Sequence, residues 1–278
     1  MDAEELLNRY AAGERDFQKA DLEGAFLGGA DLSGANLKES NLSRANLIGA
    51  SLVGTNFREA NLSSASLQAN LTEANLISTN LQDANLTAAK LVDASLRASN
   101  LRGANLTSAD LSNAVLNEVV LIDATLKRVK LTGASVARAK LMNANLAEAN
   151  LQGVNLTNSF LMGANLQGAN LEDGIFHSIN ASGIDATGAN LSRAQMSCAN
   201  LAKAIFREAT LREVSLSWAS LPRVDLTGAK LTRAKLCWAN CQGAILTRAV
   251  LIDANLNETN FTGAVLTGAI MPDGMTHQ

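Results

Sequence analysis

The sequence is poor in the residues from which globular proteins usually build a core. Of its 278 residues only 4% are aromatic, and only two are proline. A conventional globular core relies on aromatic and varied aliphatic side chains, so this composition disfavours one. The chain is instead rich in alanine, leucine and asparagine, a biased composition that favours internal repeats.

Cysteine is also scarce, and long apolar runs are absent. The three cysteines are odd in number and have no paired spacing, which is not the pattern of a secreted disulfide framework. No stretch approaches 18 consecutive apolar residues, so we expect no transmembrane helix. The leading segment MDAEELLNRY is acidic and lacks the apolar run of a signal peptide. These features predict a cytoplasmic protein without a membrane partner.

Charge is nearly balanced overall but unevenly distributed. The net charge of −3 gives no global field that would favour nucleic acid or a membrane surface. Residues 1–31 carry an excess of acids, however, and residues 193–248 carry an excess of bases. We therefore expect no direct nucleic-acid partner, and two regions of opposite surface charge.

A large apolar residue recurs every five residues, from Phe17 to Leu67 and again from Leu71 to Met271. A small residue, usually alanine, stands two positions before this centre, and Asn or Asp often stands one before it. Five matches neither the helical period nor plain strand alternation. In an extended segment, however, the centre and the residue two before it lie on the same side. The pattern therefore predicts a solenoid of short sides and corners with a continuous leucine core.

Outward residues indicate how many sides make one coil. At a spacing of twenty the charges alternate in sign, and the only two tryptophans, Trp218 and Trp238, are also twenty apart. The charged column consists of Asp173, Arg193, Glu213, Arg233 and Asp253. Opposite charges on neighbouring strands are favourable, so we expect four sides per coil. Twenty residues per coil predict about 13 coils, in a rod about 60 Å long at a strand spacing of about 4.8 Å.

The repeat ADLSGANLKESNLSRANLIGA resembles the pentapeptide-repeat family, and the likeness extends over nearly the whole chain. The resemblance implies an all-β fold, a right-handed quadrilateral β-helix with the centre and the small residue facing inward. The segments LLNRYAAGERDF and GAIMPDG are similar to the cyanobacterial branch, which includes a regulator of heterocyst differentiation. That similarity implies a protein partner such as a transcriptional regulator of cell differentiation, or a peptide signal acting on it.

The ends of the repeat predict the domain organisation. Residues 1–13 have helix signals and an apolar stripe, namely Asp2, Glu5, Leu6, Leu7, Tyr10 and Gly13. We expect this helix to cap the first coil. Residues 14–273 then form one β-helix domain, followed by a tail over residues 274–278. The turn residues Pro272-Asp273-Gly274 close the domain, and no helix for dimerisation follows, which favours a monomer.

Two irregularities interrupt the repeat. Between Leu67 and Leu71 the step is four residues, which we interpret as an absorbed deletion that shortens one corner; a designed kink is the alternative. In residues 174–190, GIFHSINASGIDATGAN, large and small inward residues exchange places without a change of register. We interpret this exchange as volume-conserving packing. The predicted core includes Leu32, Leu101, Phe176, Ile179, Ile184 and Leu216.

A filled solenoid offers no pocket with converging polar groups, so we expect no enzyme activity, no cofactor and no metal. His177 and His277 belong to no recognisable cluster of ligands. Cys241 occupies a centre and is interpreted as a small core residue rather than a ligand.

The outward surface is the better candidate for function. Trp218 and Trp238 follow their centres by two positions, and Cys198 precedes them in the same column. Tryptophan is enriched at binding hot spots, although two indoles could also simply cover each other. The candidate protein-interaction surface consists of Trp218, Trp238, Arg207, Arg223, Lys235, Arg248, His177 and Asp185.

These observations lead to three hypotheses for function. The first is a non-enzymatic, rod-shaped protein-interaction module, with the partner class implied by the family resemblance. The second, also implied by the resemblance, is a DNA mimic acting on DNA gyrase, although the basic carboxy-terminal third and the small net charge do not suit it. The third is a structural spacer.

Overall fold

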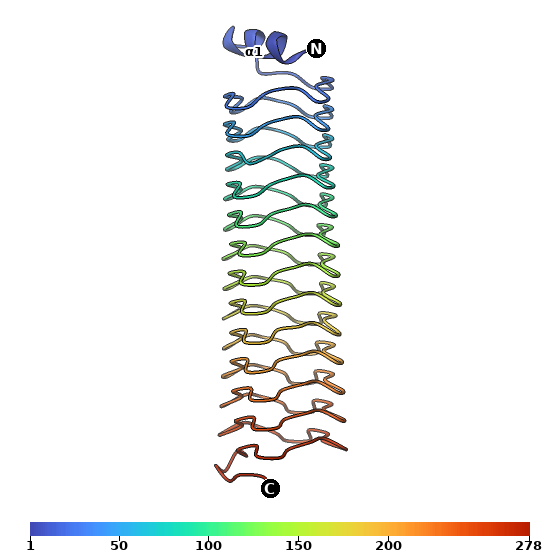
Figure 1. Ribbon diagram of the computed structural model, residues 1–278, viewed down its shortest axis with the longest axis vertical. Coiled ribbons are helices and arrows are strands. Elements are labelled where there is room, and N and C mark those ends of the chain that lie inside the picture. Colours follow the sequence, from blue (N-terminus) through green and yellow to red (C-terminus); the bar gives the residue numbers. More distant parts are fainter. The chain divides into compact units, whose positions relative to one another are not determined.

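The computed structural model describes residues 1–278 and divides into two compact units, Met1–Lys140 and Leu141–Gln278. Within each unit the chain winds through a series of stacked coils (Figure 1). The one helix, α1, spans Ala3–Ala11 at the start of the first unit. Elsewhere the regular structure consists of isolated β-bridges, nearly all of them parallel.

Backbone pairing sets the length of a coil in each unit. Asp16 pairs with Asn36 in the first unit, and Asn200 pairs with Ser220 in the second, twenty residues apart in both cases. Because a side recurs every five residues, four sides complete one coil. This is the quadrilateral arrangement that the spacing of the outward charges predicted.

The expected β-structure differs in one respect, because the structure contains bridges but no strands. Each side pairs through a single residue, the one before the centre, and a corner follows almost at once. The residue two after the centre has positive φ, for example 58° at Lys203. This left-handed conformation ends the extended segment. The corner then closes with a bond from the Ala204 N–H to the Leu201 carbonyl, 3.1 Å.

Asparagine before the centre supports both the corner and the stacking of coils. Asn200 Oδ1 accepts a hydrogen bond from the backbone N–H of Ala202 at 3.2 Å, a local turn typical of this residue. Asn200 Nδ2 also donates to Oδ1 of Asn180 on the preceding coil, 3.2 Å. The repeat therefore favours Asn or Asp here because one oxygen can serve its own corner and a neighbouring coil.

Centres and small residues together fill the interior of each unit. Leu32 and Leu101 have no exposed surface in the first unit, and Leu216 is almost fully buried in the second. Burying one leucine side chain contributes about 1.5–3 kcal/mol before entropy costs. A column of leucines can therefore replace the aromatic core that the composition lacks.

The segment 174–190 keeps the coil spacing, since Ile175 pairs with Gln195 twenty residues on. Phe176, Ile179 and Ile184 are all buried. A Cβ added to Gly174 would lie 2.5 Å from the Phe176 ring, so the ring occupies the space that alanine fills in other repeats. The interior of the coil therefore accommodates the exchange of large and small residues without a change in coil spacing.

The four-residue step produces one tighter corner in the first unit. There the Ala69 N–H bonds to the Leu67 carbonyl at 2.7 Å, two residues back rather than three. Pairing across this corner spans nineteen residues, as in the hydrogen bond that Asn80 Nδ2 donates to Asn61 Oδ1 at 3.0 Å. Gln68, at the corner itself, has a buried Oε1 with no hydrogen-bond partner.

Helix α1 begins at the Asp2 cap, whose Oδ1 accepts from the Glu5 N–H at 2.8 Å. Leu6 has no exposed surface. The Tyr10 hydroxyl reaches the first coils and donates to the Ser33 carbonyl at 2.8 Å.

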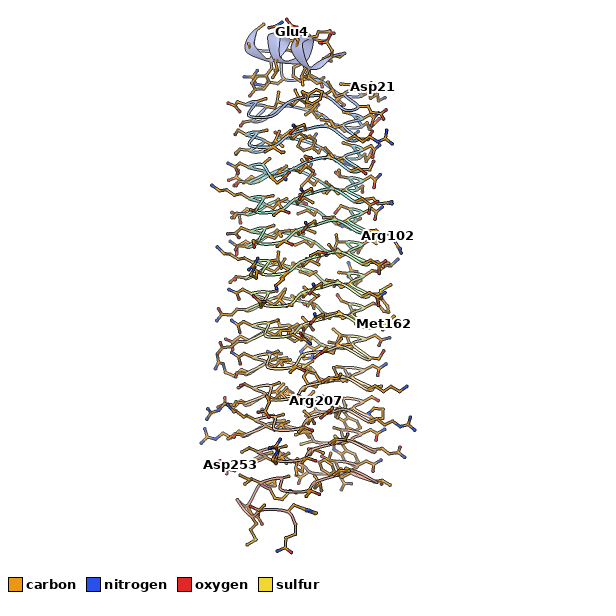
Figure 2. The ribbon with its side chains drawn as sticks, viewed as in Figure 1. Glu4, Asp21, Arg102, Met162, Arg207 and Asp253 are labelled. Atoms are coloured by element: carbon orange, nitrogen blue, oxygen red, sulfur yellow. The ribbon has the colours of Figure 1, made fainter.

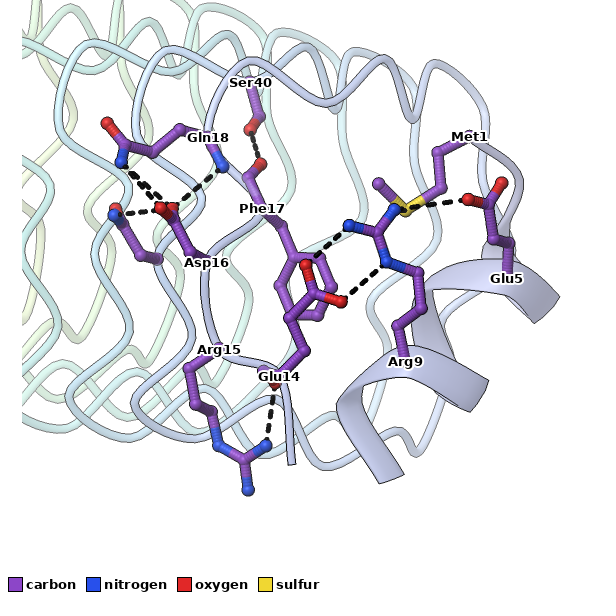
Figure 3. Close-up of polar contacts among 10 residues, drawn as sticks. Met1, Glu5, Arg9, Glu14, Arg15, Asp16, Phe17, Gln18 and Ser40 are labelled. Atoms are coloured by element: carbon purple, nitrogen blue, oxygen red, sulfur yellow. Dashed lines mark hydrogen bonds and ion pairs between the residues drawn. The ribbon is translucent and has the colours of Figure 1, made fainter. Parts of the chain in front are cut away.

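Arg9 ties α1 to the chain that follows it (Figure 3). Its guanidinium binds Glu14 at 2.7 Å and Glu5 at 3.2 Å. Its guanidinium carbon also lies 5.6 Å from the midpoint of the aromatic ring of Phe17. Phe17 is the first of the large apolar residues that recur every five positions. The helix is therefore held by both apolar and charged contacts.

The carboxy-terminal residues fold back on the last side of the second unit. The Gly274 N–H bonds to the Met271 carbonyl at 2.9 Å, which closes a turn. Ile270 then pairs with Thr276 in the one antiparallel bridge. The last residues therefore satisfy backbone groups that an open solenoid edge would leave free.

Candidate protein-interaction surface

Two stacked tryptophans dominate the outer surface of the second unit. The Trp218 and Trp238 rings lie 5.2 Å apart, centre to centre, with 5° between their planes. Their exposed fractions are 62% and 52%. Stacking covers one face of each ring, so these fractions leave much of the pair open to solvent. We call the column of Cys198, Trp218 and Trp238 the tryptophan corner.

The backbone at this corner does not favour tryptophan. Trp218 and Trp238 have φ of 62° and 60°, in the left-handed region. A bulky side chain is strained there, and glycine adopts the same conformation at lower cost. Stability of the corner therefore does not explain why two indoles occupy it.

The next corner along the chain carries two cations. Lys203 and Arg223 lie on neighbouring coils, both exposed. Neither takes part in an ion pair, although other cations of the unit do. The column continues with Gly243 and Gly263. We call these four residues the basic corner.

One side of the coil joins the two corners, and we call it the tryptophan–arginine face. Its floor carries a column of small polar residues, Asn200, Ser220, Asn240 and Asn260. Along its basic edge runs a groove of about 500 Å³, lined by Ala202, Lys203, Pro222, Arg223, Gln242, Gly243, Thr262 and Gly263. Five residues of chain separate the two corners, so they lie at most about 17 Å apart.

The corner before the tryptophans is arranged differently, and we call it the paired corner. It consists of Asp173, Arg193, Glu213, Arg233 and Asp253, the last of which is labelled in Figure 2. Arg193 binds Asp173 at 2.7 Å, and Arg233 lies 3.6 Å from Asp253. The hydrogen bond from Arg193 lowers the pKa of Asp173. Charges at this corner are therefore matched within the chain.

The other residues predicted for the surface are spread around the coil. His177 and Lys235 lie on the side that precedes the tryptophan corner, and His177 Nε2 is 3.0 Å from Gln195 Oε1. Arg248 follows Trp238 by ten residues, which is half a coil. Of the predicted set, only the tryptophans and Arg223 border the tryptophan–arginine face.

Asp185 and Arg207 lie on the side beyond the basic corner. Arg207 (labelled in Figure 2) binds Asp225 at 2.6 Å. Burial by itself would raise the pKa of Asp225, but hydrogen bonds from Thr227 and Arg207 lower it overall. Asp185 is held in a similar way, by Thr187 and Gln167. These residues are engaged within the chain, whereas Lys203 and Arg223 are not.

Sequence reasoning did not include Lys203 or the groove. The signal was present as a spacing of twenty, which joins Lys203 to Arg223 and Gly243 to Gly263. Aligning the sequence in rows of twenty residues, one row per coil, places these two cations and two glycines in a single column.

Outside this face, the structure offers few side chains suited to catalysis or to metal binding. Burial raises the pKa of the Cys241 thiol to about 12, so it remains protonated. No group of three or more His, Cys, Asp and Glu side chains is placed to hold a metal ion. No helix has the length and apolar character needed to cross a membrane.

A second hollow, of about 540 Å³, lies beside α1 in the first unit. Phe26 lines it and is 81% exposed. Four acidic residues also line it, Asp2, Glu4, Asp21 and Glu23, of which Glu4 and Asp21 are labelled in Figure 2. Its charge is opposite in sign to that of the basic corner.

A family model described as pentapeptide repeats matches residues 16–136 and 139–268, which is most of the chain. No curated protein matches the sequence.

Solved structures of similar proteins include HetL, a pentapeptide repeat protein involved in heterocyst differentiation regulation from the cyanobacterium Nostoc sp. strain PCC 7120. It is 30% identical, the alignment covers 100% of both chains, and the TM-score is 0.38. A pentapeptide repeat protein from the Arabidopsis thaliana thylakoid lumen is 30% identical over 36% of this chain and 70% of its own, with a TM-score of 0.34. QnrB1, a plasmid-mediated fluoroquinolone resistance protein, is 20% identical over 80% of this chain and 91% of its own, with a TM-score of 0.25.

Proposed function

The chain belongs to the pentapeptide-repeat family, and we propose that it is a non-enzymatic protein-interaction module that binds its partner through the tryptophan–arginine face. One observation carries the proposal: two stacked tryptophans are more than half exposed at corners whose backbone favours glycine. Exposed aromatic side chains of this kind are typical of binding hot spots.

We extend the proposal to the organisation of the molecule. Residues 14–273 form one right-handed β-helix domain of about 13 coils, at twenty residues per coil, and the protein acts as a cytoplasmic monomer. Helix α1 caps the first coil, supported by the buried Leu6 and by the bond from Tyr10 to Ser33. Deletion of residues 1–13 should then lower the free energy of unfolding or cause self-association, measured by urea titration and sedimentation. An unchanged stable monomer would remove the cap from the proposal.

For the partner we propose a transcriptional regulator of cell differentiation, or a peptide signal that acts on it. The support is the similarity of the two end segments to the cyanobacterial branch of the family. The unpaired cations Lys203 and Arg223 are unfavourable for a mimic of duplex DNA, whose surface must be acidic throughout.

The test compares two double variants of the full chain in a cross-linked pull-down from cells of its own source. Trp218→Ala with Trp238→Ala removes the proposed hot spot. Ile245→Ala with Val265→Ala is the matched control, because these side chains are also exposed, pair on neighbouring coils, and lie on another side.

We expect the tryptophan variant to lose the captured protein, while the control keeps it and both show the circular dichroism of the wild type. Equal capture by both variants would contradict this assignment of the site. Capture of nothing by the wild type would favour a structural spacer.

A further inference from the structure

We propose that the tryptophan–arginine face binds an extended acidic segment of a protein, with carboxylates on Lys203 and Arg223 and apolar side chains against the tryptophan pair. The inference rests on the proposed function, because it uses the same face. It adds the chemical class of the partner segment, and it adds the contacts of Lys203 and Arg223 to those of the tryptophan pair.

Two corners of the same unit differ in how their cations are paired. At the paired corner, Arg193 and Arg233 each have carboxylates from their own chain within 4 Å. At the basic corner, two like charges lie on neighbouring coils without such a partner. Like charges opposed across neighbouring strands are destabilising. A carboxylate from outside would relieve this repulsion and gain charge-assisted hydrogen bonds.

The groove has the length and shape to hold an extended chain. Its lining residues come from four successive coils, so it extends about 14 Å at a coil spacing of about 4.8 Å. Gly243 and Gly263 supply no side chains to fill it, and nothing lies within 4 Å of the place where a Cβ on Gly263 would be. An extended chain rises about 3.3 Å per residue, so four or five residues fit along the groove.

The tryptophan–arginine face suits a peptide better than a nucleic acid. A single strand binds by stacking its bases on aromatic rings along a continuous basic groove. Here the two indoles stack directly on each other at 5.2 Å, which leaves no gap for a base between them. The groove has only two cationic side chains, and the floor of the face carries amides and a hydroxyl rather than further lysines or arginines. These features fit a short acidic peptide with apolar residues.

The structure offers a matched pair of substitutions to test the cationic row. A Cβ on Gly243 would lie 3.5 Å from Cγ of Arg223, and a Cβ on Gly268 would lie 3.5 Å from Cγ of Arg248. Glutamate is accepted at such corners, as at Glu213 with φ of 56°. Gly243→Glu should therefore neutralise Arg223 from within the chain. Gly268→Glu makes the same change beside Arg248, away from the proposed face.

The probe is a synthetic peptide of about ten Asp, Glu and Leu residues, long enough to exceed the groove. Its neutral counterpart replaces every Asp with Asn and every Glu with Gln. Binding is followed by intrinsic fluorescence, since Trp218 and Trp238 are the only tryptophans and both lie on the face. A single-stranded oligonucleotide is titrated in parallel.

We expect the wild-type protein to bind the neutral peptide about tenfold or more weakly than the acidic peptide. The Gly243→Glu variant should bind the acidic peptide about tenfold or more weakly than the wild-type protein does. The Gly268→Glu variant should bind within about twofold of wild type, as a change remote from the contact does. Equal affinity for both peptides, equal losses in both variants, tighter binding of the oligonucleotide, or no peptide binding would each overturn the inference.

The two proposals fail in different ways in the pull-down. If Trp218→Ala with Trp238→Ala loses the partner while Gly243→Glu keeps it, the acidic segment is wrong and the interaction surface stands. If the tryptophan variant keeps the partner, the proposed function itself is wrong.

Discussion

The paired corner and the basic corner of the second unit have the same backbone and opposite surface chemistry. Both place a residue with positive φ on every coil, with 59° at Arg193 and 56° at Arg223. Arg193 binds two carboxylates of its own chain, from Asp173 and Glu172. Arg223 binds none and borders a groove. Identical corner geometry therefore does not determine what an outward side chain does.

This difference separates two roles that the same repeat can carry. A column that alternates in sign contributes a modest stabilisation, since exposed ion pairs are worth up to about 1 kcal/mol each. A column of like charge beside exposed aromatics adds nothing to stability. We infer that the interior stabilises the whole coil, while the matching or mismatching of outward columns decides where a partner binds.

The largest effect should come from the interior that both corners share. Leu216 lies inside the side that ends at Trp218, and it is buried. Replacement of Leu216 by alanine should lower the free energy of unfolding by about 2–5 kcal/mol, because the cavity cannot collapse fully. Leu231→Ala, inside the side that ends at the paired corner, should cost a similar amount. Urea unfolding of both variants tests this, and a negligible loss in either would show that the centres are not the core.

A smaller loss of stability is expected from changes at Asp225, which lies on the side beyond the basic corner. Its carboxylate forms an ion pair with Arg207 of the same chain. Its pKa is lowered in the folded state, so the unfolded state binds the proton more tightly. The stabilisation is therefore complete above the ordinary pKa of about 3.9, and it is lost as pH falls through the folded value.

Asp225→Asn should accordingly cost about 1.5–3 kcal/mol at pH 7, the range for hydrogen bonds to a charged group. The difference from wild type should shrink as the solution becomes more acidic than about pH 4. Thermal unfolding across pH measures it, and a difference that stayed constant or grew in acid would mean that the carboxylate is not held by these bonds.

A small change in stability is expected at the tryptophan corner. Trp218→Gly with Trp238→Gly removes the ring stack, worth about 0.5–1.5 kcal/mol, but also relieves left-handed strain at two positions, so the two effects on stability oppose each other. Partner binding should nevertheless be lost. Urea titration together with the pull-down measures both quantities. A large loss of stability would mean that the indoles hold the coil together, as the alternative reading of the pair requires.

The fold could be predicted from the sequence because the same kind of residue recurs at the same position of the pentapeptide with a definite physical role. Leucine fills the interior, asparagine closes the corner, and the spacing of twenty sets the coil. The absence of true strands was less accessible, because only the observed corners show that each side pairs through one residue.

The candidate surface was predictable only in part. The tryptophan column was visible in the sequence because the residue is rare. Arg248 and Arg223 are both exposed arginines, and only the coil register shows that Arg248 lies half a coil from Trp238 while Arg223 borders the tryptophan–arginine face. Whether a cation is matched depends on side-chain contacts, which spacing alone does not give.

The contrast between the two corners is tested most directly by reversing one charge at each. Arg193→Glu places a third carboxylate beside Asp173 and Glu172, whereas Arg223→Glu places a carboxylate beside Lys203. Urea unfolding should show that Arg193→Glu loses about 1 kcal/mol and that Arg223→Glu is as stable as wild type or up to about 0.5 kcal/mol more stable. An equal loss of stability in both variants would contradict the distinction between a corner that stabilises and a corner that binds.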